Sequence, residues 1–212
     1  MIASWLEFFQ GGGIVMVPLT FLSIFSLAAI LERSVFWISL LRQETKVLEQ
    51  ILAAATEDLN VALVLAEAHS QVPIARFLAA PLRLVQPEPE IFCLALETAA
   101  DQELVAMLKQ EKLFEAVIAI APLLGLLGTV TGLILSFSSF RLGDVSANLN
   151  SNGLTAGLAE ALISTATGLV IAIATLSFQR LFLALHARQV EIFRRAGNQL
   201  ELTYRIKWQA RP

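Results

Sequence analysis

One carboxylic acid lies within an otherwise uncharged apolar stretch of this sequence. Glu160, Ser164 and Thr167 follow one another at intervals of four and three residues, so on an α-helix they share one face. A carboxyl group inside or at the mouth of a membrane-spanning helix is costly to keep there and by default marks a proton or ion pathway. The alternative is that Glu160 lies among hydrated headgroups, because it comes close to the start of the stretch.

Two threonines in the apolar stretches, Thr129 and Thr165, add hydroxyl groups that can line an ion path. The alternative is that each hydroxyl bonds a carbonyl of its own helix, as buried membrane threonines often do. Apart from Glu160, these stretches contain no carboxylate, histidine or lysine. One copy of the chain therefore cannot supply two titrating groups within a membrane, and we expect a partner or further copies of the chain to complete a pore.

The composition indicates that these residues lie on membrane-spanning helices. Of 212 residues, 56% are apolar and 16% are charged, whereas soluble domains have roughly 25% charged residues. Three stretches reach the length of about 20 apolar residues that a bilayer requires. They are 14–31, 116–140 and 158–183, the last with Glu160 and Arg180 near its ends. The predicted fold is an all-α membrane protein with three transmembrane helices and long cytoplasmic helical extensions.

The distribution of basic residues predicts the orientation. Fourteen of the 15 Lys and Arg residues lie in 32–115 or from Arg180 onward, and the positive-inside rule places that side in the cytoplasm. Segment 1–13 lacks the basic residues of a secretory signal peptide, so we expect the first span to be retained. The predicted segments are an outward N-terminal segment 1–13, helix 14–31, cytoplasmic loop 32–115, helix 116–140, outward loop 141–157, helix 158–183 and cytoplasmic tail 184–212.

Small residues gather on one face of each of the last two spans. At 100° per residue they fall in one sector of about 100°. Such spacing lets another helix approach closely, and packing without any further function is the alternative reading. Pro122 removes a backbone donor near the start of its span. The faces consist of Gly125, Gly128, Thr129, Gly132, Ser136 and Ser139 on the second span, and of Gly157, Ala161, Gly168 and Ala172 on the third.

The loop 32–115 has apolar residues at helical spacing, which predicts two or three helices. Its prolines are Pro73, Pro81, Pro87 and Pro89, after which no Gly or Pro interrupts the chain up to the second span. We therefore expect one helix to continue from about Ile91 into that span. The acidic loop and the basic tail either pair with each other or are solvated separately.

Several classes of function are disfavoured by what the sequence lacks. A single cysteine, Cys93, excludes a disulfide framework, and with only two histidines no Cys/His metal cluster forms within one chain. A net charge of −3 gives no footprint for nucleic-acid binding. An intramembrane hydrolase would need a base to activate its nucleophile, and the spans offer none beside their serines. We expect no metal, no cofactor and no enzymatic activity.

The segment 121–132, APLLGLLGTVTG, resembles the second-span motif of the ExbB/TolQ/MotA proton-channel superfamily. The segment 157–169, GLAEALISTATGL, resembles its third-span motif, and 11–33 is also similar. The resemblance covers nearly the whole chain except 44–90. The sequence Ala-Glu-Ala-Leu around Glu160 resembles the ExbB and TolQ branch, because flagellar MotA stators usually have four spans and an apolar residue there.

The resemblance implies a homopentamer whose second and third spans line a central pore. In that pore lie the single transmembrane helices of an ExbD- or TolR-like partner, each with an aspartate that takes the proton. The family positions that match Thr129, Thr165 and Glu160 line the pore, and the proline that matches Pro122 shapes the lining helix. Thr131 departs from the family pattern, where a bulky residue is common.

The implied function is an inner-membrane motor subunit that powers a TonB- or TolA-like protein through the proton-motive force. Two alternatives remain open at this point. One is a MotA-like flagellar or gliding stator, and the other is a non-conducting membrane scaffold that uses the same small-residue faces only for packing.

Overall fold

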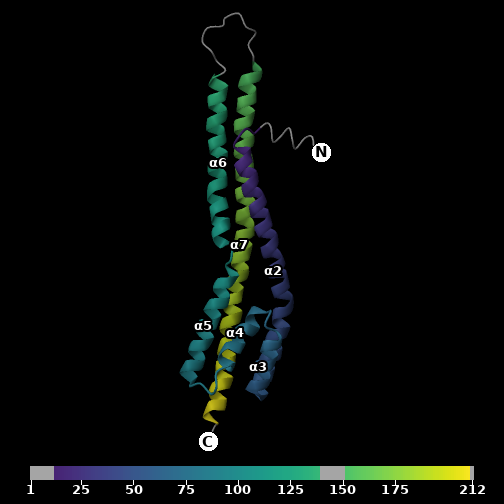
Figure 1. Ribbon diagram of the computed structural model, residues 1–212, viewed down its shortest axis with the longest axis vertical. Coiled ribbons are helices and arrows are strands. Elements are labelled where there is room, and N and C mark those ends of the chain that lie inside the picture. The colour runs from purple at the N-terminus through teal and green to yellow at the C-terminus, as the bar shows by residue number, and fades with distance from the viewer. Residues whose placement is uncertain (1–11, 139–150, 211–212) are drawn as a thin grey trace, which may run out of the picture. The chain divides into compact units, whose positions relative to one another are not determined.

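The computed structural model describes residues 12–138 and 151–210, and over these residues it contains helices and no strand (Figure 1). Three helical stretches of the described chain, containing α2, α6 and α7, are long and apolar enough to cross a membrane. The predicted all-α membrane fold is thus confirmed. The predictions for Ser139 and for most of 1–13 fall outside the described residues. The helices are α2 (Met16–Glu57), α3 (Leu59–Ala68), α4 (Pro73–Leu82), α5 (Pro89–Met107), α6 (Glu111–Ser138) and α7 (Ser151–Gln209).

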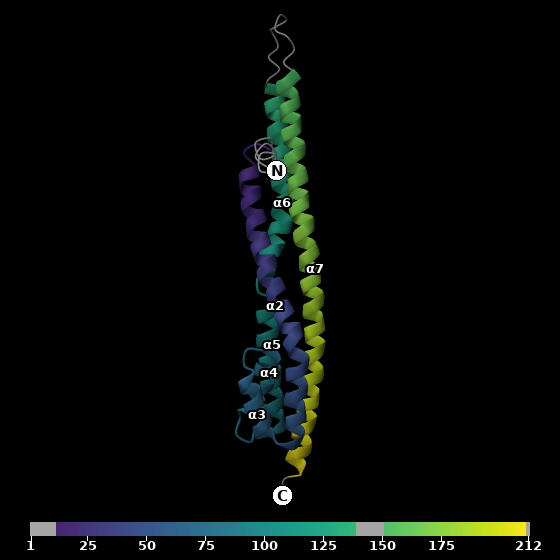
Figure 2. The same ribbon diagram turned by 90° about the vertical axis from the view of Figure 1, so that its right-hand side faces the viewer.

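The chain divides into two compact units. The first, which we name the span unit, contains the chain up to Leu31 and Gln110–Arg180. Within it α6 lies beside the first part of α7, as both views show (Figures 1 and 2). The chain at the start of α2 contacts both helices. Large apolar side chains of α6 such as Leu126, Ile134 and Phe137 are exposed, as befits a surface that meets lipid. A buried apolar cluster of the span unit consists of Val15, Met16, Leu19, Ala121 and Ala172.

The expected continuous helix from Ile91 into the second span is wrong. α5 ends at Met107, and α6 begins at Glu111 after a turn in which Gln110 adopts a left-handed φ of 75°. The buried guanidinium of Arg33 donates from Nη1 to the Met107 carbonyl oxygen at 2.9 Å. A cation at the carboxyl end of a helix satisfies an otherwise unpaired carbonyl and interacts favourably with the helix dipole. The end of α5 is therefore marked by a contact from a residue distant in sequence, and not by a Gly or Pro.

The other boundaries follow local chemistry. Pro73 and Pro89 open α4 and α5, where a missing N–H costs nothing. Pro122 lies inside α6, which continues past it to Ser138. α7 begins at Ser151, so the last part of the predicted loop 141–157 is helical. Gly157 does not end the helix because it is buried against α6.

The second unit, which we name the loop-and-tail unit, contains Glu32–Lys109 and the chain from Leu181. Within it α4 packs against α3 and α5. The tail of α7 joins the loop helices through aromatic pairs: Phe193 stacks on Phe77 at 4.8 Å between ring centroids, and Tyr204 on Phe92 at 4.0 Å. Of the two arrangements left open by the sequence, pairing of loop and tail is the one observed.

A buried polar pair interrupts the apolar contact between α2 and α7 in this unit. Glu44 is 3% exposed and Gln189 is fully buried, and the Gln189 amide donates from Nε2 to Glu44 Oε2 at 2.7 Å. Among the described residues, Oε1 of Glu44 and Oε1 of Gln189 have no hydrogen-bond partner. Burial raises the pKa of Glu44, although the Gln189 hydrogen bond and the charge of Arg188 oppose the shift. A protonated Glu44 would carry one O–H, and the Gln189 amide oxygen is a free acceptor beside it.

This pair predicts a pH dependence of stability. Because the pKa of Glu44 is raised in the folded state, its contribution is fully present below the unfolded pKa of about 4.3 and is lost as the pH rises through the folded pKa. We expect Glu44→Gln to stabilise the fold at pH 8 by about 1–3 kcal/mol, since no buried charge remains. The measurement is the apparent thermal midpoint of both proteins in detergent between pH 4 and pH 8, with exposed Glu49→Gln as control. Equal slopes for all three proteins would contradict the prediction.

Candidate functional site

The carboxyl group of Glu160 lies against the chain just before α2. Glu160 is half-buried on α7, and its Oε1 occupies the place that a side chain on Gly13 would need: a Cβ atom there would overlap Glu160 Oε1 and Cδ. Gly13 has a φ of 69°, in the left-handed region that glycine adopts readily. The carboxylate therefore rests on bare backbone.

The residues around this contact come from three segments of the span unit, and we name the place the three-helix junction. A Cβ on Gly12 would lie 3.3 Å from Cγ2 of Ile163 on α7. A Cβ on Gly128 of α6 would overlap the Ser164 side chain and lie 3.7 Å from Cβ of Val15. The absence of side chains at Gly13 and Gly128 thus allows α6, α7 and the start of α2 to meet. Figure 2 shows these three helices side by side.

Ser164 lies at the centre of the junction and is fully buried. Its hydroxyl donates to the carbonyl oxygen of Ala161 at 3.0 Å, with the Gly125 oxygen of α6 at 3.5 Å. Because this hydroxyl is enclosed between two helices, it is part of the α6–α7 contact within one chain.

The three predicted pathway threonines differ in their contacts. Thr165 donates across the helix contact to the carbonyl oxygen of Gly125 at 2.9 Å. Thr129 and Thr167 donate within their own helices, to the oxygens of Leu126 at 2.6 Å and of Ile163 at 2.8 Å. Of the two threonines for which a local bond was the alternative, Thr129 makes that bond, whereas Thr165 bonds to α6. All three threonines remain partly exposed, so their pore-facing role stays a prediction.

The glycines of the two small-residue faces lie at van der Waals distance across the α6–α7 contact. A Cβ on Gly132 would lie 2.7 Å from the carbonyl oxygen of Gly157, and one on Gly157 would overlap Ser136 Oγ. A Cβ on Gly125 would lie 3.0 Å from Cα of Thr165, and one on Gly168 would overlap the carbonyl oxygen of Ala121. No side chain can move aside where the obstacle is backbone, so these positions set the separation of the helices.

Two further polar contacts of the span unit were not singled out from the sequence. The hydroxyls of Ser26 and Thr175 lie 2.7 Å apart, and both are buried. Thr175 already donates to the Ile171 carbonyl, so Ser26 is the donor. Near the end of the unit, Gln179 donates to Glu111 Oε1 at 2.5 Å. Thr175 and Gln179 continue the buried face of Ser164, Gly168 and Ala172, a spacing that could have indicated them.

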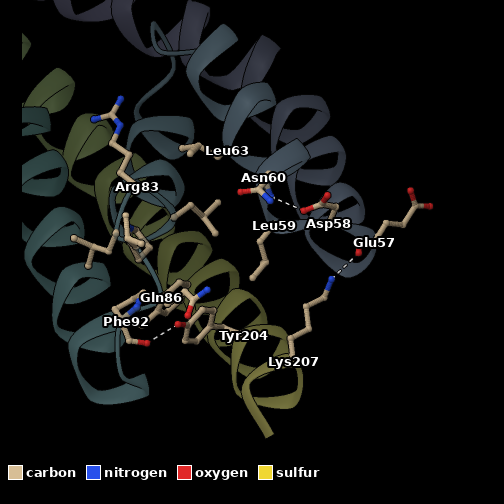
Figure 3. A pocket seen from close by; sticks show the side chains of 15 residues that line it. Glu57, Asp58, Leu59, Asn60, Leu63, Arg83, Gln86, Phe92, Tyr204 and Lys207 are labelled. Carbon is tan, nitrogen blue, oxygen red and sulfur yellow. Dashed lines mark hydrogen bonds between the residues drawn. The ribbon is translucent and has the colours of Figure 1, made fainter. Parts of the chain in front are cut away.

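The loop-and-tail unit has a pocket of about 590 Å³ (Figure 3). Three of its charged side chains, those of Lys207, Asp58 and Arg83, have partners within the chain. The Lys207 ammonium donates to the Glu57 carbonyl oxygen at 2.7 Å, and Asp58 accepts the backbone N–H of Asn60 at 2.8 Å. Arg83 pairs with Glu67 at 3.0 Å. This pocket offers less reactive chemistry than the three-helix junction.

Comparison with known proteins shows which family the chain resembles. The family model described as the MotA/TolQ/ExbB proton channel family matches residues 69–195. The biopolymer transport protein ExbB-like 1 of Synechocystis sp. is 45% identical over 203 residues, which cover 96% of this chain and 80% of the relative. The biopolymer transport protein ExbB-like 3 of the same organism is 40% identical over 196 residues, which cover 92% of this chain and 93% of the relative.

The close α6–α7 contact can be tested at Gly168. Its Cβ would meet the Ala121 carbonyl oxygen, which belongs to the backbone and cannot move aside without shifting α6. We expect Gly168→Ala to destabilise the protein by about 1–3 kcal/mol, as overpacking does, despite the better helix propensity of alanine. The measurement is the thermal midpoint in detergent. The matched control is Gly197→Ala on the same helix, whose Cβ would approach only the ring edge of Phe77, at 3.1 Å. Equal midpoints for the two variants would show that the backbone contact does not limit the packing.

Proposed function

Because the chain belongs to the MotA/TolQ/ExbB proton channel family, we propose that it is an inner-membrane subunit of a motor driven by the proton-motive force. Copies of the chain, five by family resemblance, surround the single transmembrane helices of an ExbD- or TolR-like partner. The assembly then drives a TonB- or TolA-like protein. The relatives' description as ExbB-like biopolymer transport proteins supports this branch of the family over a MotA-like stator.

The observation that carries the proposal is the position of Glu160. It is an ionisable side chain in the span unit, half-buried at the three-helix junction and followed one turn later by the hydroxyls of Ser164 and Thr165. A carboxylate in a membrane-spanning helix is costly to keep there, so by default it indicates a proton or ion pathway. The uncharged stretches offer no second acid, which is why the proposal assigns the second titrating group to an aspartate of the partner.

The energy for the motion comes from the membrane potential. One elementary charge that crosses 100 mV releases about 2.3 kcal/mol. In the proposed step, the partner's aspartate takes a proton near Thr129 and Thr165 and loses its charge. The neutral side chain can then pass the apolar surface of the next subunit, where a charged one would have to be desolvated.

The proposed orientation places the N-terminus in the periplasm and both the loop-and-tail unit and the C-terminus in the cytoplasm. It rests on the concentration of Lys and Arg in that unit. In this orientation Glu160 lies toward the periplasmic end of its span, where a proton would enter.

A non-conducting scaffold is the second candidate. It is favoured by the glycine faces, which are used for packing within one chain, and by the local hydrogen bonds of Thr129 and Thr167. A scaffold would require neither the charge of Glu160 nor its ability to titrate.

Glu160→Gln separates the two candidates, because it keeps the shape of the side chain and removes its proton exchange. We expect the variant to assemble normally and to lose most of its proton flux, measured in proteoliposomes that contain the chain and its co-purified single-span partner. Assembly is checked by size-exclusion chromatography. Flux equal to that of the wild type would exclude Glu160 from the pathway and favour the scaffold.

The two threonines allow a graded test of the pore lining. Thr129→Val and Thr165→Val are nearly isosteric, and we expect both to assemble and to reduce proton flux. Thr165→Val also removes the hydrogen bond to the Gly125 oxygen, so we expect this variant to lose about 1 kcal/mol of stability and its thermal midpoint to fall. The midpoint of Thr129→Val should change less. Two variants with unchanged flux would remove both residues from the proposed path.

A further inference from the structure

We infer that Gly13 is a positioning residue for Glu160: its bare, left-handed backbone forms a seat that fixes where the carboxyl group lies at the three-helix junction. The inference rests on the proposed function in one respect, since it takes Glu160 as the proton-exchanging group. The contact between Gly13 and the Glu160 carboxyl group is observed in the structure and does not depend on that function.

The Glu160 side chain occupies the space beside Gly13 that any other residue's side chain would need. A Cβ atom on this residue would occupy the place of Glu160 Oε1 and Cδ, and would lie 3.0 Å from Cγ. Three atoms of one side chain thus lie against one glycine. Any other L-residue would displace the carboxyl group or move the chain before α2.

The backbone conformation of Gly13 also favours glycine at this position. Gly13 has a φ of 69°, which L-residues other than Asn and Asp rarely adopt. The Gly13 carbonyl accepts the N–H of Met16 at 3.1 Å, so this conformation is tied to the first turn of α2. The seat is therefore held by the helix that follows it.

No charged or polar side chain among the described residues holds the Glu160 carboxylate in place. Within the described residues, no hydrogen bond and no ion pair is made by the Glu160 carboxylate, whereas its neighbours Ser164 and Thr165 are both hydrogen-bonded. Shape, supplied by the bare backbone of Gly13, is what positions the carboxyl group. A group held by shape keeps its place whether or not it carries a proton, which suits a site that exchanges one.

The experiment measures the reactivity of Glu160 in the full-length protein in its own membranes. The probe is dicyclohexylcarbodiimide, which modifies protonated carboxyl groups in apolar surroundings, and the rate of modification at residue 160 is followed by mass spectrometry from pH 5 to pH 9. Four proteins are compared with the wild type: Gly13→Ala, Gly12→Ala, Glu160→Asp, and Gly13→Ala combined with Glu160→Asp.

We expect Gly13→Ala to expel the carboxyl group, to change its modification rate several-fold and to shift the pH midpoint of that rate. Gly12→Ala is the matched control, because its Cβ would meet the Met16 side chain and not Glu160. Its profile should equal that of the wild type. Glu160→Asp withdraws the carboxyl group by one methylene, so in the double variant the alanine is accommodated and the profile should match that of Glu160→Asp alone.

A wild-type profile for Gly13→Ala, or an equal change in Gly12→Ala, would overturn the inference. If Gly13→Ala does not accumulate in membranes, the double variant decides: recovery of assembly supports the seat, and no recovery overturns it. A failure of the proposed function is distinguishable, because it would show as wild-type proton flux in Glu160→Gln, whatever the carbodiimide profile of the Gly13 variants.

Discussion

The close approach of α6 and α7 is the constraint on which the rest of the span unit depends. In a bilayer, apolar side chains gain nothing by leaving lipid for a neighbouring helix, so association relies on van der Waals contact and interhelical hydrogen bonds. Backbone atoms at Gly132 of α6 come within contact of α7, and those at Gly168 of α7 within contact of α6, because neither residue has a Cβ. This separation lets Thr165 reach the Gly125 carbonyl, and it sets the space in which the chain before α2 meets Glu160.

Polar groups then fix the register that small residues alone leave free. Gly and Ala faces can slide by one turn at little cost, whereas the Ser26–Thr175 pair has one alignment in which both hydroxyls are satisfied. In the loop-and-tail unit, Glu44 and Gln189 have the same role between apolar neighbours, as polar residues do at single positions of coiled coils. The cost differs, because Glu44 is ionisable and its burial ties the stability of the unit to pH.

The fold was predictable as far as periodicity and charge determine it. Uncharged runs gave the three long apolar helices, and helical spacing gave the buried face of Gly125, Gly128 and Gly132. The break at Gln110 was missed because a contact from Arg33, distant in sequence, accompanies it. The spacing of residues tells which face of a helix is small or polar, but not which residue of another helix will meet it. For that reason the contact between Glu160 and Gly13 could only be found in three dimensions.

A carboxyl group seated on a glycine also explains how one acid can serve a moving partner. A salt bridge within the chain would hold Glu160 in its charged form and oppose protonation, and full burial would favour the neutral form. Against the backbone of Gly13 the carboxyl group makes no salt bridge with the described residues and stays half-exposed. In the proposed function, the second acid belongs to the partner. Under that proposal the incompleteness of the intramembrane chemistry couples the subunit to its partner, because the proton moves only while the partner's acid is near.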